Sequence, residues 1–128
     1  MHTFPVTVYY EDTDMAGIVY HANYLKFIER ARSDWVKQQG LDQQSMREDE
    51  GIVFVVRRIE ADYLASAVFD DQLEIQTTVK AMTGVRLVML QEVLREGEPV
   101  FRAEVTAVCM TTSGQPARLP AQLRRRVH

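Results

Sequence analysis

The chain has 128 residues, a length typical of one domain, and we expect a single domain over residues 1–128. Its apolar share of 46% is close to that of globular proteins, which excludes a disordered chain. Fifteen Lys and Arg residues stand against 18 Asp and Glu residues, for a formal net charge of −3, which argues against a broad nucleic-acid-binding surface.

The cysteine count and the apolar runs of the sequence bear on the cellular compartment of the protein. The lone Cys109 has no partner for an internal disulfide, so nothing indicates an oxidising environment. Residues 1–10 lack a basic stretch followed by a long apolar run, so we expect no secretory signal. The apolar run 52–56 is too short to cross a bilayer. We therefore predict a cytoplasmic protein with no membrane span.

The first predicted element is a strand over residues 4–10, where Val6, Val8 and Tyr10 alternate with their neighbours. The acidic segment 11–17 ends in Gly and is typical of a turn or loop.

The strongest periodicity predicts a helix over residues 23–39. Its apolar positions share one face and form a wide stripe, made up of Tyr24, Leu25, Phe27, Ile28, Ala31, Trp35 and Val36. Gly40 follows as a natural helix stop. A stripe this wide indicates a helix buried against a sheet. Residues 42–51 are polar and predict a loop with a helical turn.

The remainder of the chain predicts four strands joined by short turns, over residues 52–63, 72–81, 85–94 and 101–109. Short connections favour antiparallel pairing, and one helix against such a sheet gives an α+β domain. Because the strands carry more apolar side chains than one helix can cover, we also predict a homo-oligomer.

The densest group of reactive side chains joins the first strand to the helix. It contains three carboxylates, a glycine and a histidine, namely Glu11, Asp12, Asp14, Gly17 and His21. The first N–H groups of a helix have no internal partners and lie at the positive end of its dipole, so they can bind a developing oxyanion. A nearby carboxylate can act as a nucleophile or as a general base toward water. These are the groups needed to hydrolyse an activated acyl compound.

Two structural alternatives apply to this segment. An Asp before a helix is more often a cap or a turn former than a catalyst, and an isolated His is more often a hydrogen-bonded structural residue. A calcium loop is excluded, although Asp12, Asp14 and Gly17 fit its first half, because Ala16 and Asn23 occupy positions that need other ligands. We expect no metal.

The run from Val8 to Asp14, followed by Gly17, residues 19–22 and Tyr24, resembles the opening motif of the 4-hydroxybenzoyl-CoA thioesterase family. It is especially similar to the acyl-CoA thioesterases associated with the bacterial Tol–Pal system. Residues 29–32, 54–57, 70–71 and 73–75 also match. The resemblance implies the hotdog fold, in which a five-stranded antiparallel sheet wraps around one long helix, and a homodimer or homotetramer.

The resemblance also implies roles for single residues. Asp14 matches the catalytic carboxylate, and His21 matches the position whose main-chain N–H polarises the thioester carbonyl. Asp12 and Glu11 match motif positions that we interpret as structural. The neighbouring motif residues are expected to bind substrate: Gly17, Ile18, Tyr20, Asn23 and Tyr24. Met15 and Ile18 differ from the residues usual at these motif positions. Because such changes bear on the acyl pocket, the motif does not predict the length of the acyl group.

The implied substrate is an acyl-CoA, with acyl carrier protein as an alternative acyl donor, and no cofactor is expected because coenzyme A is part of the substrate. Two rival functions remain: a dehydratase or hydratase on the same fold, and a binding protein for acyl carrier protein or envelope complexes with weak hydrolysis. Cys109 is interpreted as a buried strand residue. Residues 124–126 form a basic tail that is either solvated or in contact with the coenzyme A phosphates.

Overall fold

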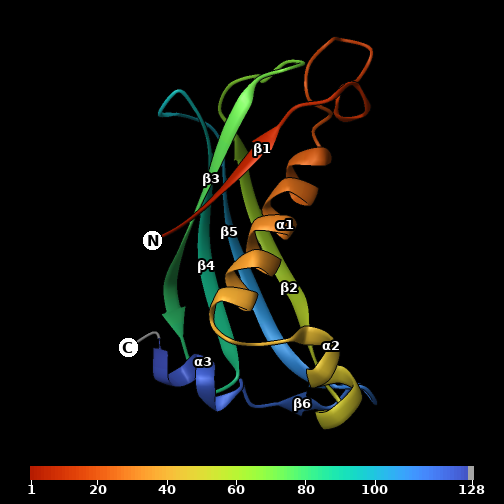
Figure 1. Cartoon of the computed structure of the whole chain (residues 1–128), viewed down its shortest axis with the longest axis vertical. Helices are drawn as coiled ribbons and strands as arrows, with labels where there is room; N and C mark the ends of the chain where they lie inside the picture. The colour runs from red at the N-terminus through yellow and green to blue at the C-terminus, as the bar shows by residue number, and fades with distance from the viewer. Residues whose placement is uncertain (127–128) are drawn as a thin grey trace.

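The computed structural model describes residues 1–126, with side chains up to Arg124 (Figure 1). Its strands are β1 (His2–Thr7), β2 (Ile52–Tyr63), β3 (Gln72–Met82), β4 (Arg86–Arg95), β5 (Glu98–Thr111) and β6 (Pro116–Ala117). Its helices are α1 (Asn23–Gln38), α2 (Gln43–Ser45) and α3 (Ala121–Arg126), with a 3₁₀ turn η1 (Tyr10–Asp12) and a π-helical turn η2 (Met46–Glu50). The predicted α+β class is confirmed.

All strand pairs are antiparallel, and the strand order across the sheet is β1-β3-β4-β5-β2, with β6 beside β5. Alternate residues of the central strands are buried on the face toward α1, as the period-two pattern predicts. The long α1 helix lies across this face (Figure 1). A long helix held by an antiparallel sheet is the hotdog arrangement that the sequence resemblance implies.

The predicted helix is confirmed and ends one residue early, at Gln38. Gly40 adopts a φ of +83°, a left-handed conformation that ends the helix at little cost for a glycine. The apolar stripe is buried as predicted except for Leu25, which is 37% exposed. That expectation was wrong because α1 packs on β1 and β3, whereas Leu25 shares a helix flank with Glu29 and Arg32 on the side toward β2.

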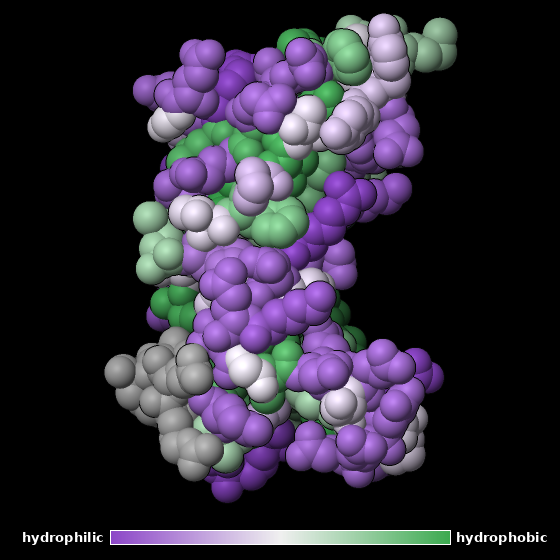
Figure 2. All heavy atoms as spheres, viewed as in Figure 1, coloured by the Kyte–Doolittle hydropathy of each residue, from purple (hydrophilic) through white to green (hydrophobic). Residues whose placement is uncertain are grey.

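The edge strand β2 exposes an apolar strip on its inner face. Within the described residues β2 pairs only with β5, and its outer edge is free. Val56, Ile59 and Tyr63 pair with buried β5 residues and so face the same side, yet they are 42%, 36% and 49% exposed. We call these three residues the inner β2 strip. Figure 2 shows the outline hollowed on this side, between the loop that precedes α1 and the turn at α2.

Two parts of the chain differ from the sequence prediction. The first strand ends at Thr7 rather than residue 10, because Tyr10–Asp12 turn into η1. The sheet gains the short sixth strand β6, and α3 follows it. Elements of two and six residues are too short to show a period, although Leu119 and Leu123 of this segment are buried and close one end of the core.

Candidate active site

The loop between β1 and α1 folds back on itself as a small hairpin. The Asp14 N–H donates to the Ile18 carbonyl at 2.9 Å, and the Gly17 N–H donates to the Asp14 carbonyl at 3.0 Å. Gly17 has a φ of +80°, which a side chain would disfavour. The hairpin therefore carries Asp14 on its outgoing arm and leads the chain back to the start of α1.

Asp12 fixes this hairpin to the helix. Its carboxylate is buried and accepts hydrogen bonds from the Tyr9 N–H and the Asn23 side-chain amide, both at 2.8 Å. Its carbonyl accepts from the Tyr20 N–H, also at 2.8 Å. These contacts support the structural role interpreted for Asp12. They also turn the buried Asn23 amide inward, so the expectation that this side chain binds substrate is not supported by its position.

Loss of this anchor should destabilise the protein. Asp12→Ala leaves the Asn23 amide and the Tyr9 N–H without acceptors, and we expect the free energy of unfolding to fall by about 2–4 kcal/mol. Urea denaturation followed by circular dichroism measures this change. Glu11→Gln is the matched control, because the Glu11 side chain in the same turn is exposed. Equal stability of the two variants would show that Asp12 does not hold the loop.

Asp14 is exposed at the turn of the hairpin. One of its carboxylate oxygens accepts a hydrogen bond from the Ala16 N–H at 2.8 Å, which is the turn-forming role that the sequence leaves open. The other oxygen accepts no hydrogen bond within the described part of the chain. The side chain is therefore held by its turn while one oxygen remains available for chemistry.

The helix start presents free main-chain donors, among them the N–H groups of His21 and Ala22. Tyr20–Asn23 forms a turn in which the Asn23 N–H donates to the Tyr20 carbonyl at 2.8 Å. The N–H groups of His21 and Ala22, inside this turn, have no acceptor among residues 1–126. Both lie at the positive end of the α1 dipole. They can hydrogen-bond an oxygen that becomes negative during a reaction.

The other residues that were predicted to bind substrate differ in how far they are exposed to solvent. Gly17 and Tyr20 are exposed and Ile18 is half-buried, so all three lie at the surface of the loop. The Tyr20 ring also contacts the imidazole of His21, with centroids 4.7 Å apart. Tyr24 is buried in the core, and its ring stacks on Phe101 at 4.9 Å. Burial raises the pKa of the Tyr24 hydroxyl. Its position is that of a core residue rather than a substrate-binding one.

Tyr63, at the end of β2, reaches this site although it lies far away in sequence. Its hydroxyl donates a hydrogen bond to the His21 carbonyl at 2.9 Å. Its ring packs edge-on against Phe101, with centroids 5.0 Å apart. Sequence reasoning missed this residue because no local pattern links a strand end to a helix start. The only signal was the alternation that places Tyr63 on the inner face of its strand.

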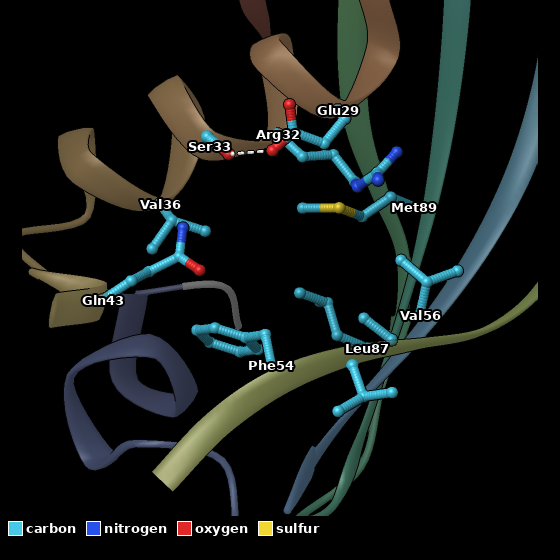
Figure 3. Close-up of a pocket in the computed structure, with 11 residues that line it drawn as sticks. Glu29, Arg32, Ser33, Val36, Gln43, Phe54, Val56, Leu87 and Met89 are labelled. Carbon is cyan, nitrogen blue, oxygen red and sulfur yellow. Dashed lines mark hydrogen bonds between the residues drawn. The ribbon is translucent and has the colours of Figure 1, made fainter. Parts of the chain in front are cut away.

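A pocket of about 140 Å³ lies along the flank of α1 that faces β2 (Figure 3). Figure 3 shows Arg32, Met89 and Phe54 pointing into it. The Arg32 guanidinium donates to the buried Gln91 side chain at 3.0 Å, and burial lowers its pKa. Neither Asp14 nor His21 lines the pocket. The pocket therefore lies further along α1 than the His21 and Ala22 N–H groups and is separate from them.

Other candidate groups lie away from the site. Cys109 is buried as predicted, and burial raises the pKa of its thiol to about 11, which disfavours the nucleophilic thiolate. Arg124 donates to the Leu119 carbonyl at 3.0 Å, on α3 at the opposite end of the molecule from the start of α1 (Figure 1). The side chains of residues 125 and 126 lie outside the described residues.

Neither a metal-binding cluster nor a membrane-spanning helix occurs within the described residues. Within residues 1–126, no group of three or more His, Cys, Asp or Glu side chains is placed to hold a metal ion. In the same range, no helix has both the length and the apolar character needed to cross a membrane.

Comparison with known proteins places this geometry in a family. The model of the thioesterase-like superfamily matches residues 8–127. The chain belongs to the thioesterase-like superfamily. The resemblance noted from the motif is thereby confirmed.

Two relatives and one solved structure show how close the similarity is. The chain is 35% identical to the acyl-CoA thioesterase YbgC of Haemophilus influenzae, over 98% of this chain and 93% of the relative. It is 44% identical to the acyl-CoA thioester hydrolase YbgC of Escherichia coli, over 84% and 80%. The crystal structure of a probable thioesterase from Bartonella henselae superposes with a TM-score of 0.89 and 36% identity, over 93% and 98%. The hotdog fold is confirmed by these matches.

Proposed function

We propose that this protein is an acyl-CoA thioesterase that hydrolyses an acyl-CoA thioester to a free acid and coenzyme A. Relatives of 35% and 44% identity carry that activity in their names. The observation that carries the proposal is a carboxylate with a free oxygen, Asp14, on a loop that leads into the unpaired N–H groups of His21 and Ala22 at a helix start. Such donors stabilise the oxyanion of acyl transfer.

The chemistry needs only these groups and water. The His21 N–H hydrogen-bonds the thioester oxygen and makes the carbonyl carbon more electrophilic. Asp14 then attacks that carbon, the C–S bond breaks, and coenzyme A leaves as a thiolate. Water hydrolyses the resulting mixed anhydride to the free acid and restores Asp14. In the alternative route Asp14 takes a proton from the water that attacks the carbonyl directly. Neither route requires a cofactor, since coenzyme A is part of the substrate.

The acyl group has a path along α1. Gly17, Ile18 and Tyr20 surround the loop at the helix start. The pocket beside Glu29 begins about 9 Å along the helix from its start at Asn23, at a rise of 1.5 Å per residue. Leu25, on the same flank, is the exposed apolar residue between them. An extended acyl chain that follows this flank reaches the pocket.

We propose further that the active unit is a homo-oligomer, a dimer or a tetramer, in which a second copy covers the inner β2 strip. Unpaired edges and exposed apolar faces of this kind are typical of interfaces. The strip includes Tyr63, whose hydroxyl contacts the helix start. The interface is therefore adjacent to the proposed site. A cytoplasmic location, acyl carrier protein as acyl donor and an association with the Tol–Pal system stay predictions.

Thiol release from a panel of acyl-CoA substrates of different chain lengths tests the proposed function. The proposal expects stoichiometric free thiol and acid from at least one substrate. A change at an enoyl chromophore without thiol release would instead support a dehydratase or hydratase. Tight carrier-protein binding that survives Asp14→Asn, with negligible turnover of every substrate, would support a binding protein.

A further inference from the structure

A single long-range hydrogen bond holds the peptide group at the helix start. The Tyr63 hydroxyl donates to the His21 carbonyl at 2.9 Å, from a strand end that is 42 residues away in sequence. The His21 carbonyl accepts no main-chain N–H among the described residues. The flanking groups are held differently: the Tyr20 and Asn23 N–H groups both have main-chain acceptors. Tyr63 is thus the group that sets the orientation of the His21–Ala22 peptide.

The Tyr63 ring is itself fixed by packing. It meets Phe101 edge-on at 5.0 Å and Tyr24 edge-on at 5.8 Å, and both of these residues are buried. Partial desolvation raises the pKa of the Tyr63 hydroxyl above its ordinary value. The hydroxyl therefore keeps its proton at neutral pH and can act as a donor. A ring that packs on two buried aromatic side chains and carries a protonated hydroxyl can hold a main-chain group in place.

We propose that Tyr63 is a positioning residue for thioester hydrolysis, whose hydroxyl orients and polarises the His21–Ala22 peptide so that the His21 and Ala22 N–H groups bind the developing oxyanion together. This inference rests on the proposed thioesterase function. To the proposed thioesterase site it adds the Ala22 N–H as a second hydrogen-bond donor for the oxyanion. It also adds the Tyr63 side chain, which acts on the substrate only through the His21–Ala22 peptide.

The physical reason is cooperativity between the two ends of a peptide group. The His21 carbonyl and the Ala22 N–H belong to the same peptide unit. A hydrogen bond to the carbonyl draws electron density toward oxygen and makes the N–H a stronger donor. The N–H points to where negative charge grows during attack on the carbonyl carbon. Its strengthened bond therefore stabilises the transition state more than the bound substrate.

Tyr63→Phe tests the proposal, because it removes the hydroxyl and keeps the ring that packs on Phe101. We expect kcat to fall about three- to tenfold, the effect of one neutral hydrogen bond, while KM changes less than about twofold. The rates are measured on the intact oligomer with the best acyl-CoA of the panel. Thermal unfolding of the same preparation reports whether the packing is retained.

Tyr63→Leu separates packing from hydrogen bonding, since it removes both the ring and the hydroxyl. If Tyr63 acted only through packing, Tyr63→Phe would match the wild type in kcat and only Tyr63→Leu would be impaired. That result would overturn the proposal, as would a loss confined to KM. An active wild type with an inactive Asp14→Asn variant and a normal Tyr63→Phe variant would refute this inference alone. Absence of thioesterase activity in the wild type would instead refute the proposed function.

Discussion

Replacing Asp14 with Asn should lower kcat for thioester hydrolysis at least about 10²-fold, the low end for a positioned acid–base group. The amide is a poor nucleophile and a poor base, so both chemical routes lose their reacting group. The substitution keeps the side-chain size and leaves an oxygen that can accept from the Ala16 N–H, which holds the turn at 2.8 Å. Steady-state thiol release measures the effect.

Glu11→Gln is the matched control for this prediction. Glu11 is an exposed carboxylate in the same loop. Its neutralisation removes one negative charge, as Asp14→Asn does, and should leave kcat within about twofold of the wild type. Near-normal turnover by folded Asp14→Asn would remove Asp14 from the mechanism.

Placing a charge on the inner β2 strip should dissociate the oligomer and inactivate it. Ile59→Asp puts a carboxylate on the uncovered inner face of the edge strand, where a second copy is proposed to pack. An unpaired charge buried in an interface costs about 3–5 kcal/mol, which weakens association more than 10²-fold. We expect light scattering with size-exclusion chromatography to show single chains, and kcat/KM to fall at least about tenfold.

Glu60→Ala is the control for this experiment, since the next residue along β2 points to the opposite face of the sheet. It should leave both the mass and the activity unchanged. Circular dichroism shows whether the Ile59→Asp chain is folded, which is expected because Ile59 is already partly exposed. A folded Ile59→Asp variant that keeps the oligomer mass of the wild type would exclude this face as the interface.

The periodicity of apolar residues in the sequence was sufficient to predict the long helix and most of the strands. The wide stripe on α1 and the left-handed Gly40 place the helix within one residue of its end. Strand alternation identifies the face of the sheet that is buried, for example along β4. Leu25 was misassigned because a helical stripe shows which residues share a face, and does not show how far the sheet extends beneath it. The short β6 and α3 carry too few residues for any period.

The sequence predicted which loop carries the candidate site residues, and only part of the contacts that these residues make. The motif places Asp14 and His21 on the loop before α1, as the structure has them. It gives no direction for each side chain, so the inward turn of Asn23 toward Asp12 could not be foreseen, whereas the burial of Tyr24 follows from the helical stripe. Contacts between distant segments, such as Tyr63 with the His21 carbonyl, require the register of the whole sheet.

The infrared carbonyl stretch of a ¹³C-labelled thioester bound to Asp14→Asn tests the central claim most directly. Because this variant is expected to turn over at least about 10²-fold more slowly than the wild type, the spectrum can be recorded before the bound thioester is consumed. The label separates the substrate carbonyl from those of the protein. If the free N–H groups of His21 and Ala22 hold the thioester oxygen, the stretch moves to lower frequency than in buffer. A saturated complex whose stretch is the same as that of free substrate would contradict the proposed role of the helix start.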